Sequence, residues 1–248
     1  MKKIIFLFLI SLCLSSYSQD NKYLPLVNKG VVITHQHYIL SYVEEYEGAE
    51  WVAYELTYSE TKNNVDRREG EFFEDDSVKT GSAVHKDYTN TGYDRGHLAP
   101  AGDMNFELMA MLESFNMSNV LPQTPELNRK IWKYLEDDIR YYVMRNKNPL
   151  YVITGGVFSF NPIHIGIKNK VDIPEYFYKI IYDDTNGKII AFMMPNVKNP
   201  NNDYVYYVTS VAWIEFYTGV DFFPNVDENF ELKFTNKVEK INWLTKNK

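Results

Sequence analysis

Cysteine is almost absent from this sequence, which holds a single one, Cys13, among its 248 residues. One thiol cannot form an intrachain disulfide, and no Cys and His residues have the spacing typical of a structural zinc site. Apolar runs long enough to cross a bilayer are missing as well, since that takes about 20 residues. Aromatic side chains, in contrast, make up 16% of the sequence. The composition therefore predicts a globular protein stabilised by a packed core.

Positive charge is also scarce, with 26 Lys and Arg residues against 33 Asp and Glu and a net charge of −7. Such a balance argues against binding a polyanion, because nucleic acids attract surfaces rich in Lys and Arg. The basic residues are nevertheless unevenly distributed. The segment 128–147 contains Arg129, Lys130, Lys133, Arg140, Arg145 and Lys147, with Glu136, Asp137 and Asp138 as its acids. We therefore expect one locally basic face, with most acidic residues lying elsewhere.

The N-terminus has the three parts of a secretory signal peptide. Lys2 and Lys3 make the start basic, residues 4–14 are apolar or carry hydroxyls, and residues 15–19 are mostly small and polar. The apolar part is too short to span a bilayer, and cleavage is expected after Ser18. A lipid anchor on Cys13 is a weaker alternative, because the residue before it is Leu12 instead of a small one. We expect a signal peptide over 1–18, a single domain over 19–248, and a secreted or periplasmic protein without stable membrane association.

Short β-branched and aromatic runs alternate with helical stretches along the chain. Strands are expected within 31–56 and at 150–154, 176–182 and 188–194, with a hairpin turn at 184–187. Helices are expected at 106–115, from Thr124 to about Asn146, and at 209–217. Hairpins without regular βαβ alternation indicate an α+β fold, with a central, largely antiparallel sheet flanked by helices.

The segment Asp94-Arg95-Gly96-His97 places an acid, a permanent cation and a titratable base within four residues. An arginine can bind a phosphate through two nitrogens at once. A neutral histidine, whose pKa is ordinarily about 6.5, can take a proton from water. The segment therefore predicts a site for phosphate chemistry. From these residues alone, an Asp94–Arg95 ion pair at a surface turn, beside an uninvolved His97, is the alternative.

Asn128 and Glu136, on the helix expected from Thr124, form a second candidate site. Magnesium prefers oxygen ligands and keeps several waters, so one amide oxygen and one acid suit it. Eight residues of regular α-helix separate the two positions by roughly 12 Å along the axis and about 80° around it. Asn128 is therefore the expected direct ligand, and Glu136 is expected to hold a water of the ion. Taken singly, each is more often an ordinary solvated residue.

Together these motifs resemble the DNA/RNA non-specific endonucleases, which are ββα-metal nucleases. The pattern is Asp94-Arg95-Gly96-His97, then Ser118-Asn119, Pro122-Gln123, Asn128, Trp132 and Leu135-Glu136, at matching spacings. The resemblance covers about residues 30–226 and includes segments 51–56, 66–69, 151–156, 171–179, 194–196 and 217–225. It implies that the α+β fold contains a ββα-metal active-site motif.

The resemblance also implies roles for the candidate residues. His97 is expected to act as the general base that activates water for in-line attack on a phosphodiester. Asn128 is expected to ligate one magnesium ion, with manganese as the alternative, while Glu136 holds the ion's waters. Arg95 is expected to clamp the phosphate. Asn119 is expected to help orient His97 or the phosphate.

The remaining implied roles are less specific. One of Arg67 or Arg68 is expected to join the phosphate clamp, although either could be an ordinary surface charge. Asp94 is expected to be structural. Lys179 could approach a phosphate, but its position in a predicted strand favours a side chain that extends to solvent.

The sequence therefore predicts an exported, magnesium-dependent endonuclease acting on both DNA and RNA. A lack of sequence specificity follows if its contacts go to phosphate and sugar, which carry little sequence information. Two other classes stay open: a nucleic-acid-binding module of the same fold without hydrolysis, and a phosphodiesterase for small diesters.

Overall fold

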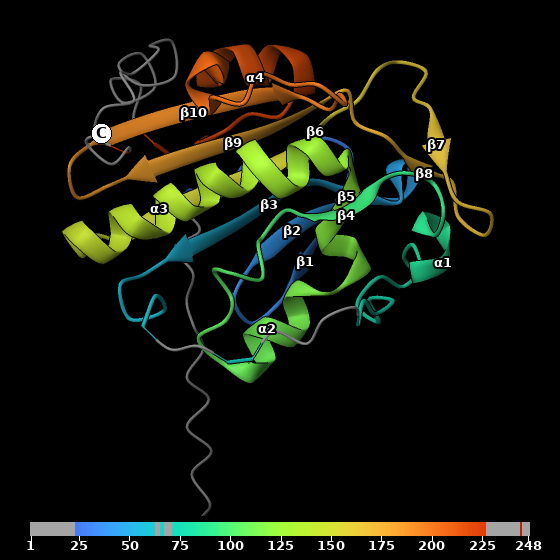
Figure 1. The fold of residues 1–248 in the computed structure, drawn as a ribbon, viewed down its shortest axis with the longest axis horizontal. Coiled ribbons are helices and arrows are strands. Elements are labelled where there is room, and N and C mark those ends of the chain that lie inside the picture. The colour runs from blue at the N-terminus through green and yellow to red at the C-terminus, as the bar shows by residue number, and fades with distance from the viewer. Residues whose placement is uncertain (1–22, 63–64, 67–70, 227–243, 245–248) are drawn as a thin grey trace, which may run out of the picture.

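A seven-stranded antiparallel sheet forms the centre of the protein, in the order β1-β2-β3-β6-β9-β10-β11 (Figure 1). The computed structural model describes residues 23–62, 65–66, 71–226 and 244. The strands of this sheet are β1 (Val31–Thr34), β2 (Ile39–Val43), β3 (Gly48–Leu56), β6 (Leu150–Val157), β9 (Tyr176–Asp183), β10 (Lys188–Pro195) and β11 (Val208–Thr209). The expected signal peptide lies outside the described residues.

Two small antiparallel ribbons and several helices complete the fold. The ribbons pair β4 (Asp94–His97) with β5 (Val120–Gln123) and β7 (His164–Ile165) with β8 (Val171–Asp172). The α-helices are α1 (His85–Tyr88), α2 (Leu108–Ser114), α3 (Lys133–Asn146) and α4 (Val211–Thr218), with a π-helical segment η4 (Leu127–Trp132) before α3 and the 3₁₀ turns η2 (Glu44–Tyr46), η3 (Met117–Asn119) and η5 (Tyr204–Tyr207). The predicted α+β class is confirmed. No helix in the described ranges is long and apolar enough to cross a membrane.

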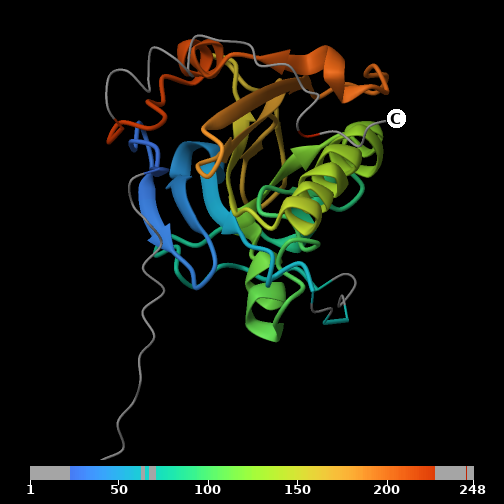
Figure 2. The ribbon, with the colours of Figure 1, turned by 90° about the vertical axis from the view of Figure 1, so that its left-hand side faces the viewer.

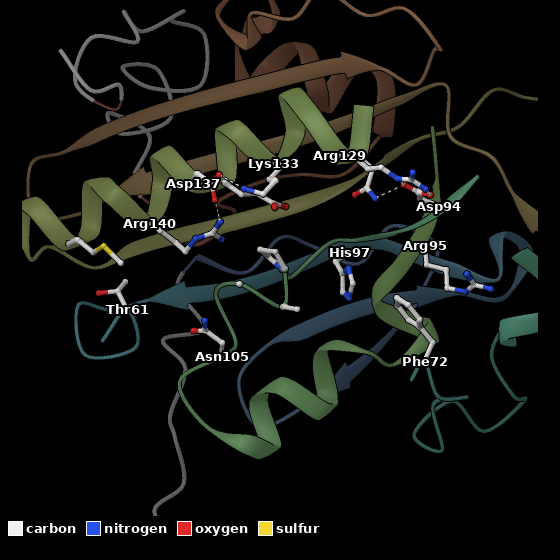
Figure 3. Close-up of a pocket in the computed structure, with 16 residues that line it drawn as sticks. Thr61, Phe72, Asp94, Arg95, His97, Asn105, Arg129, Lys133, Asp137 and Arg140 are labelled. Atoms are coloured by element: carbon white, nitrogen blue, oxygen red, sulfur yellow. Dashed lines mark hydrogen bonds and ion pairs between the residues drawn. The ribbon is translucent and has the colours of Figure 1, made fainter. Parts of the chain in front are cut away.

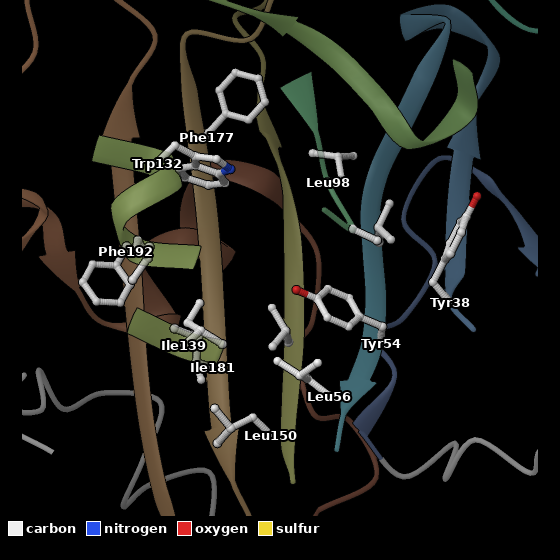
Figure 4. Close-up of a cluster of buried hydrophobic side chains, with 14 of the residues drawn as sticks. Tyr38, Tyr54, Leu56, Leu98, Trp132, Ile139, Leu150, Phe177, Ile181 and Phe192 are labelled. Carbon is white, nitrogen blue, oxygen red and sulfur yellow. The ribbon is translucent and has the colours of Figure 1, made fainter. Parts of the chain in front are cut away.

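The central sheet is covered on both faces, with α3 on one side and α4 on the other (Figures 1 and 2). Successive residues of one strand therefore enter different cores. In β9, Ile181 packs with Ile139 of α3, whereas Ile180 packs in the cluster that contains Ile214 of α4. Figure 4 shows the α3 side, where Trp132 meets Phe177 with ring centroids 5.7 Å apart. Because both faces of β6 and β9 are buried, apolar residues follow one another along these strands, with few polar interruptions such as Thr154 and Lys179.

Two of the expected helices differ from the sequence patterns in detail. The long helical stretch runs from residue 125 to 146 as predicted, but it opens with the π-helical segment η4. Helix α2 is shorter than the expected 106–115, and its first two residues, Leu108 and Met109, are about half exposed. The apolar composition of α2 therefore suggested deeper burial than the fold provides.

The ribbon of β4 and β5 leads directly into η4 and α3, which gives a ββα unit. The ribbon pairs Asp94 with Gln123 and His97 with Val120. A Cβ atom at Gly96 would lie 2.4 Å from Oε1 of Gln123, so glycine is required for this close approach. Strand β4 can therefore lie close against β5, with the polar residues of β4 beside the helix.

Candidate active site

A cleft of about 720 Å³ lies between β4, α3 and the 100–105 loop (Figure 3). It is lined by Thr61, Phe72, Asp94, Arg95, His97, Pro100, Ala101, Gly102, Asn105, Asn128, Arg129, Lys133, Glu136, Asp137, Arg140 and Met144. Four of the predicted site residues, Arg95, His97, Asn128 and Glu136, therefore face one space.

His97 is held in the cleft by aromatic packing. Its ring centroid lies 5.3 Å from that of Phe72 and 5.2 Å from that of Phe115, which is nearly perpendicular to it. These contacts restrict rotation of the imidazole. Phe72 was not recognised in the sequence, because one Phe in a polar loop has no distinctive pattern.

Asn128 is oriented by Asp94 across the ribbon and helix. Its Nδ2 donates to Oδ2 of Asp94 at 2.9 Å, which leaves the amide oxygen on the other side of the group. The same carboxylate accepts from Nε and Nη2 of Arg129, at 2.8 and 2.6 Å. The alternative Asp94–Arg95 ion pair is not formed: Asp94 is bound to Arg129, and the Arg95 guanidinium lies against other groups. Asp94 is therefore a positioning residue for Asn128, which sharpens the predicted structural role.

Glu136 reaches the same cleft from the following helix. A π turn holds more residues than an α turn, so each residue of η4 rotates the chain by less than the usual 100°. The expected offset of about 80° between Asn128 and Glu136 is thereby reduced. Burial raises the pKa of the Glu136 carboxyl to about 7, while Lys179 and Arg140 oppose this shift with their positive charges.

Lys179 does not extend to solvent, so that prediction was wrong. It is fully buried under α3, where its Nζ donates to Oγ1 of Thr154 at 2.7 Å and lies 5.0 Å from the Trp132 ring centroid. Burial lowers the pKa of Lys179, and the charges of Glu136 and Asp103 act in the opposite direction. The cause lies in the fold: β9 is a central strand covered on both faces.

Arg95 lines the cleft, but its side chain runs away from His97 (Figure 3). The guanidinium lies between the rings of Phe72 and Tyr88, 5.5 and 5.4 Å from their centroids. Its Nη2 donates to the backbone oxygen of His85 at 2.6 Å. The cation is therefore held rigidly at the edge of the cleft.

Asn119 lies behind the cleft and does not line it. It is fully buried, its Oδ1 accepts from the Ala99 amide at 2.9 Å, and its Nδ2 donates to the carbonyls of Ala99 and Ser114. These contacts fix the backbone at Ala99, two residues after His97. The position does not support the expected contact with phosphate. An orienting effect on His97 through the backbone stays a prediction. Arg67 and Arg68 lie outside the described residues, so their expected phosphate contact also stays a prediction.

Cationic side chains outnumber acidic ones in the cleft. Its cations are Arg95, Arg129, Lys133 and Arg140, and its acids are Asp94, Glu136 and Asp137. Ion pairs neutralise part of this charge, since Asp137 binds Lys133 at 2.5 Å and also binds Arg140. Arg140 further binds the buried Asp103 at 2.5 Å. Three acidic residues line the cleft, and two of them, Asp94 and Asp137, are held in ion pairs. The other acidic residues of the described structure do not line it, which agrees with the expectation that most of them lie elsewhere.

The donor set of the cleft fits a hard, hydrated divalent cation. The amide oxygen of Asn128 and the carboxylate of Glu136 are oxygen donors of the kind that magnesium prefers. The described residues hold no group of three His, Cys, Asp or Glu able to form a site by themselves. An ion at Asn128 would therefore keep several waters, as magnesium usually does.

A histidine, an amide and a carboxylate around one cleft, carried by a two-stranded ribbon and the helix that follows it, define the site of a ββα-metal nuclease. The family model described as DNA/RNA non-specific endonuclease matches residues 20–229. The chain belongs to this family, as the motif resemblance predicted.

Several known proteins are similar over most of the chain. A nuclease from Nostoc sp. is 34% identical over 82% of this chain and 76% of its own length. Mitochondrial endonuclease G from Homo sapiens is 33% identical over 77% of this chain and 69% of its own length. A crystal structure of the EndoG/EndoGI complex matches with a TM-score of 0.74 at 28% identity, covering 82% of this chain and 89% of the matched one.

Proposed function

We propose that this chain is an exported, magnesium-dependent endonuclease that hydrolyses phosphodiester bonds of DNA and RNA without sequence preference. The observation that carries the proposal is the cleft in which His97, Asn128 and Glu136 come together on a ββα unit. Membership of a nuclease family supports the same chemistry.

His97 acts as the general base in this proposal. Its imidazole accepts a proton from water as the water oxygen bonds to phosphorus and the bond from phosphorus to the 3′ oxygen breaks. The leaving oxygen takes the bonding electron pair and then a proton from solvent, which gives 5′-phosphate and 3′-hydroxyl ends. Phe72 and Phe115 fix the ring so that the accepting nitrogen stays aligned during this transfer.

Asn128 would hold the divalent ion through its amide oxygen, and Glu136 would hold waters of that ion. When bound, such an ion supplies Lewis-acid stabilisation of negative charge on the phosphate and the departing oxygen. Asp94 keeps the Asn128 amide in the required orientation through the 2.9 Å hydrogen bond. Arg95 adds a fixed positive charge at the edge of the same space.

The metal requirement is tested with purified protein on plasmid DNA and on RNA, with EDTA and after adding back magnesium or manganese. We expect cutting of both polymers, complete loss in chelator and recovery with added metal. Undiminished cutting in EDTA would overturn the metal dependence, and hydrolysis of small diesters without any cutting of polymers would overturn the nuclease assignment. Binding of both polymers without turnover would instead identify a non-catalytic module.

Export is supported by the basic and apolar character of residues 1–18. The test is N-terminal sequencing of protein recovered from the periplasm and the culture medium. A mature start at Gln19 is expected. A chain that keeps Met1 and stays inside the cell would overturn this part of the proposal.

A further inference from the structure

A second hollow adjoins the catalytic cleft at the start of β4. It measures about 360 Å³ and shares Asp94, Arg95 and Arg129 with the cleft. Its other walls include Thr89 and Tyr93 from the chain between α1 and β4. The two hollows are therefore neighbours on one surface, separated by the side chains that line both of them.

The order of side chains along β4 connects the two hollows. Residues two apart on a strand share a face and lie roughly 6.6 Å apart, so Arg95 follows His97 on one face. Arg95 lines both hollows, and Tyr93, the residue directly before β4, lines the second one. A nucleic-acid strand with its reacting phosphate at His97 would therefore meet the guanidinium of Arg95 and then the aromatic ring of Tyr93.

The charges of the second hollow suit an anion. It contains two guanidinium groups, of Arg95 and Arg129, and one carboxylate, Asp94, which is already bound to Arg129. Within the described structure, the buried Nε of Arg95 has no hydrogen-bond partner. Because Phe72 and Tyr88 hold this guanidinium in place, little entropy is lost when an anion binds.

Tyr93 supplies the apolar recognition element. It is half-buried, packs partly against the small core around Tyr88 and Val120, and lines the hollow. An aromatic ring at the edge of a cationic groove is how many proteins bind single strands, since bases stack on the ring while cations meet the backbone. A nucleotide, whose phosphate and base are separated by a sugar, fits this combination.

We infer that the second hollow binds the nucleotide next to the cleaved phosphodiester, with Arg95 and Arg129 on its phosphate and Tyr93 against its base. This assignment rests on the proposed function, because it names a further part of the same substrate. Small diesters without a flanking nucleotide would not use the hollow. Single strands, whose bases are free to stack on a side chain, would use it more fully than duplexes.

The test measures binding separately from catalysis. Single-stranded DNA oligonucleotide is titrated into the full chain carrying His97→Ala, with fluorescence anisotropy as the readout. Adding Tyr93→Leu is expected to raise Kd about 5-fold or more, because stacking of one base contributes about 1–3 kcal/mol. Tyr93→Phe, which keeps the ring, should stay within about twofold of the parent. A Tyr93→Leu protein that binds as tightly as the parent would overturn the inference.

A second pair of variants keeps the test valid if Tyr93→Leu fails to fold. Thr89 is exposed at the rim of the hollow, so its substitution leaves the core intact. Thr89→Glu should weaken oligonucleotide binding and Thr89→Lys should tighten it, each by roughly twofold. Equal Kd values for the two variants would contradict an anionic ligand here.

Kinetics on the active enzyme separate this inference from the proposed function. In the chain with His97 intact, Tyr93→Leu should raise KM for the oligonucleotide with little change in kcat, and leave hydrolysis of bis(p-nitrophenyl) phosphate unchanged. An equal loss on both substrates would show a general defect and overturn the subsite. If the parent enzyme cuts nothing, the proposed function fails, while the binding data still decide the subsite.

Discussion

Strands β6 and β9 bury apolar side chains on both faces, whereas β4 carries Asp94, Arg95 and His97 within four residues. The two regions also differ in regularity. Strand β9 pairs in unbroken register with β6 and β10, while the ribbon of β4 and β5 is short and leads into a π-helical segment. Polar groups that must meet a substrate cannot be buried in a dry core without partners. The sheet therefore supplies stability, and the ββα unit packed against one of its faces supplies the polar groups of the cleft.

Loss of His97, the proposed general base, should give the largest effect on activity. Replacing His97 with Ala is expected to lower kcat by about 10²- to 10⁴-fold, the usual contribution of a positioned base, with little change in Tm. Plasmid cleavage rates and thermal unfolding measure the two quantities. His164→Ala, at an exposed histidine on β7, is the matched control and should keep full activity.

The sheet should give the opposite result. Truncating the buried Ile181 to Ala is expected to cost about 2–5 kcal/mol of unfolding free energy, because it leaves a cavity between β9 and α3. The folded fraction should keep its kcat. Urea denaturation measures the loss, with the fully exposed Ile167→Ala as control at about 0.5 kcal/mol or less. A stable Ile181→Ala protein with impaired catalysis would break the division between the two regions.

Substitutions of Asp94 test whether the ββα unit depends on residues that position the proposed reacting groups. Asp94→Ala removes the acceptor that orients Asn128, and should weaken the affinity for the activating metal by about 10- to 100-fold. Activity measured against metal concentration gives this value. Asp94→Asn keeps an acceptor oxygen and should recover part of the affinity. If both variants behave like the parent, Asn128 is positioned by other contacts.

Glu136 should make the stability of the metal-free protein depend on pH. Its pKa is raised by burial from 4.5 to about 7, so folding favours the protonated form. The stability that this contributes is present below about pH 4.5 and is lost as pH rises through about 7. In EDTA at pH 8, Glu136→Gln should therefore be more stable than the parent by up to about 3 kcal/mol, with no difference at low pH.

Thermal unfolding across pH measures this crossover for Glu136→Gln. Glu175→Gln, at an exposed position, serves as the control and should change stability little at any pH. A Glu136→Gln protein that is less stable than the parent at pH 8 would show that the carboxylate is stabilised in the fold.

The smallest effect is expected at the rim of the cleft. Lys133 and Asp137 form an exposed pair on successive turns of α3. Lys133→Ala should cost only about 0.3–0.5 kcal/mol of stability, and less at high salt. Chemical denaturation at two salt concentrations measures it. A larger loss would mean that the pair, together with Arg140, acts as a structural network.

The regular parts of the fold could be predicted because their patterns are local. Apolar runs at 176–182 and 188–194 gave strands β9 and β10, and the helical stripe gave α3. The ribbon strand β4 has no such pattern, since Asp, Arg, Gly and His are poor strand formers. Its partner β5 contains Pro122, which lowers strand propensity further. Only the motif resemblance indicated this unit.

The residue types of the site could be predicted from the sequence, but the contacts that these residues make could not. His97, Asn128 and Glu136 were recognised from their chemistry and spacing, and the structure places them in one cleft. The burial of Lys179 was missed because it depends on the strand being central in the sheet. The packing of Phe72 on His97 joins segments distant in sequence, so no local pattern records it.

The π-helical segment has a consequence for transplanting this site into another protein. On a regular α-helix, an Asn and a Glu spaced as Asn128 and Glu136 would diverge by about 80°, and both would not face one ion. A spacing of seven residues would reduce the divergence to about 20°. A designer using an ideal helical scaffold should therefore omit one residue between the amide and the carboxylate, or else build the π turn as well.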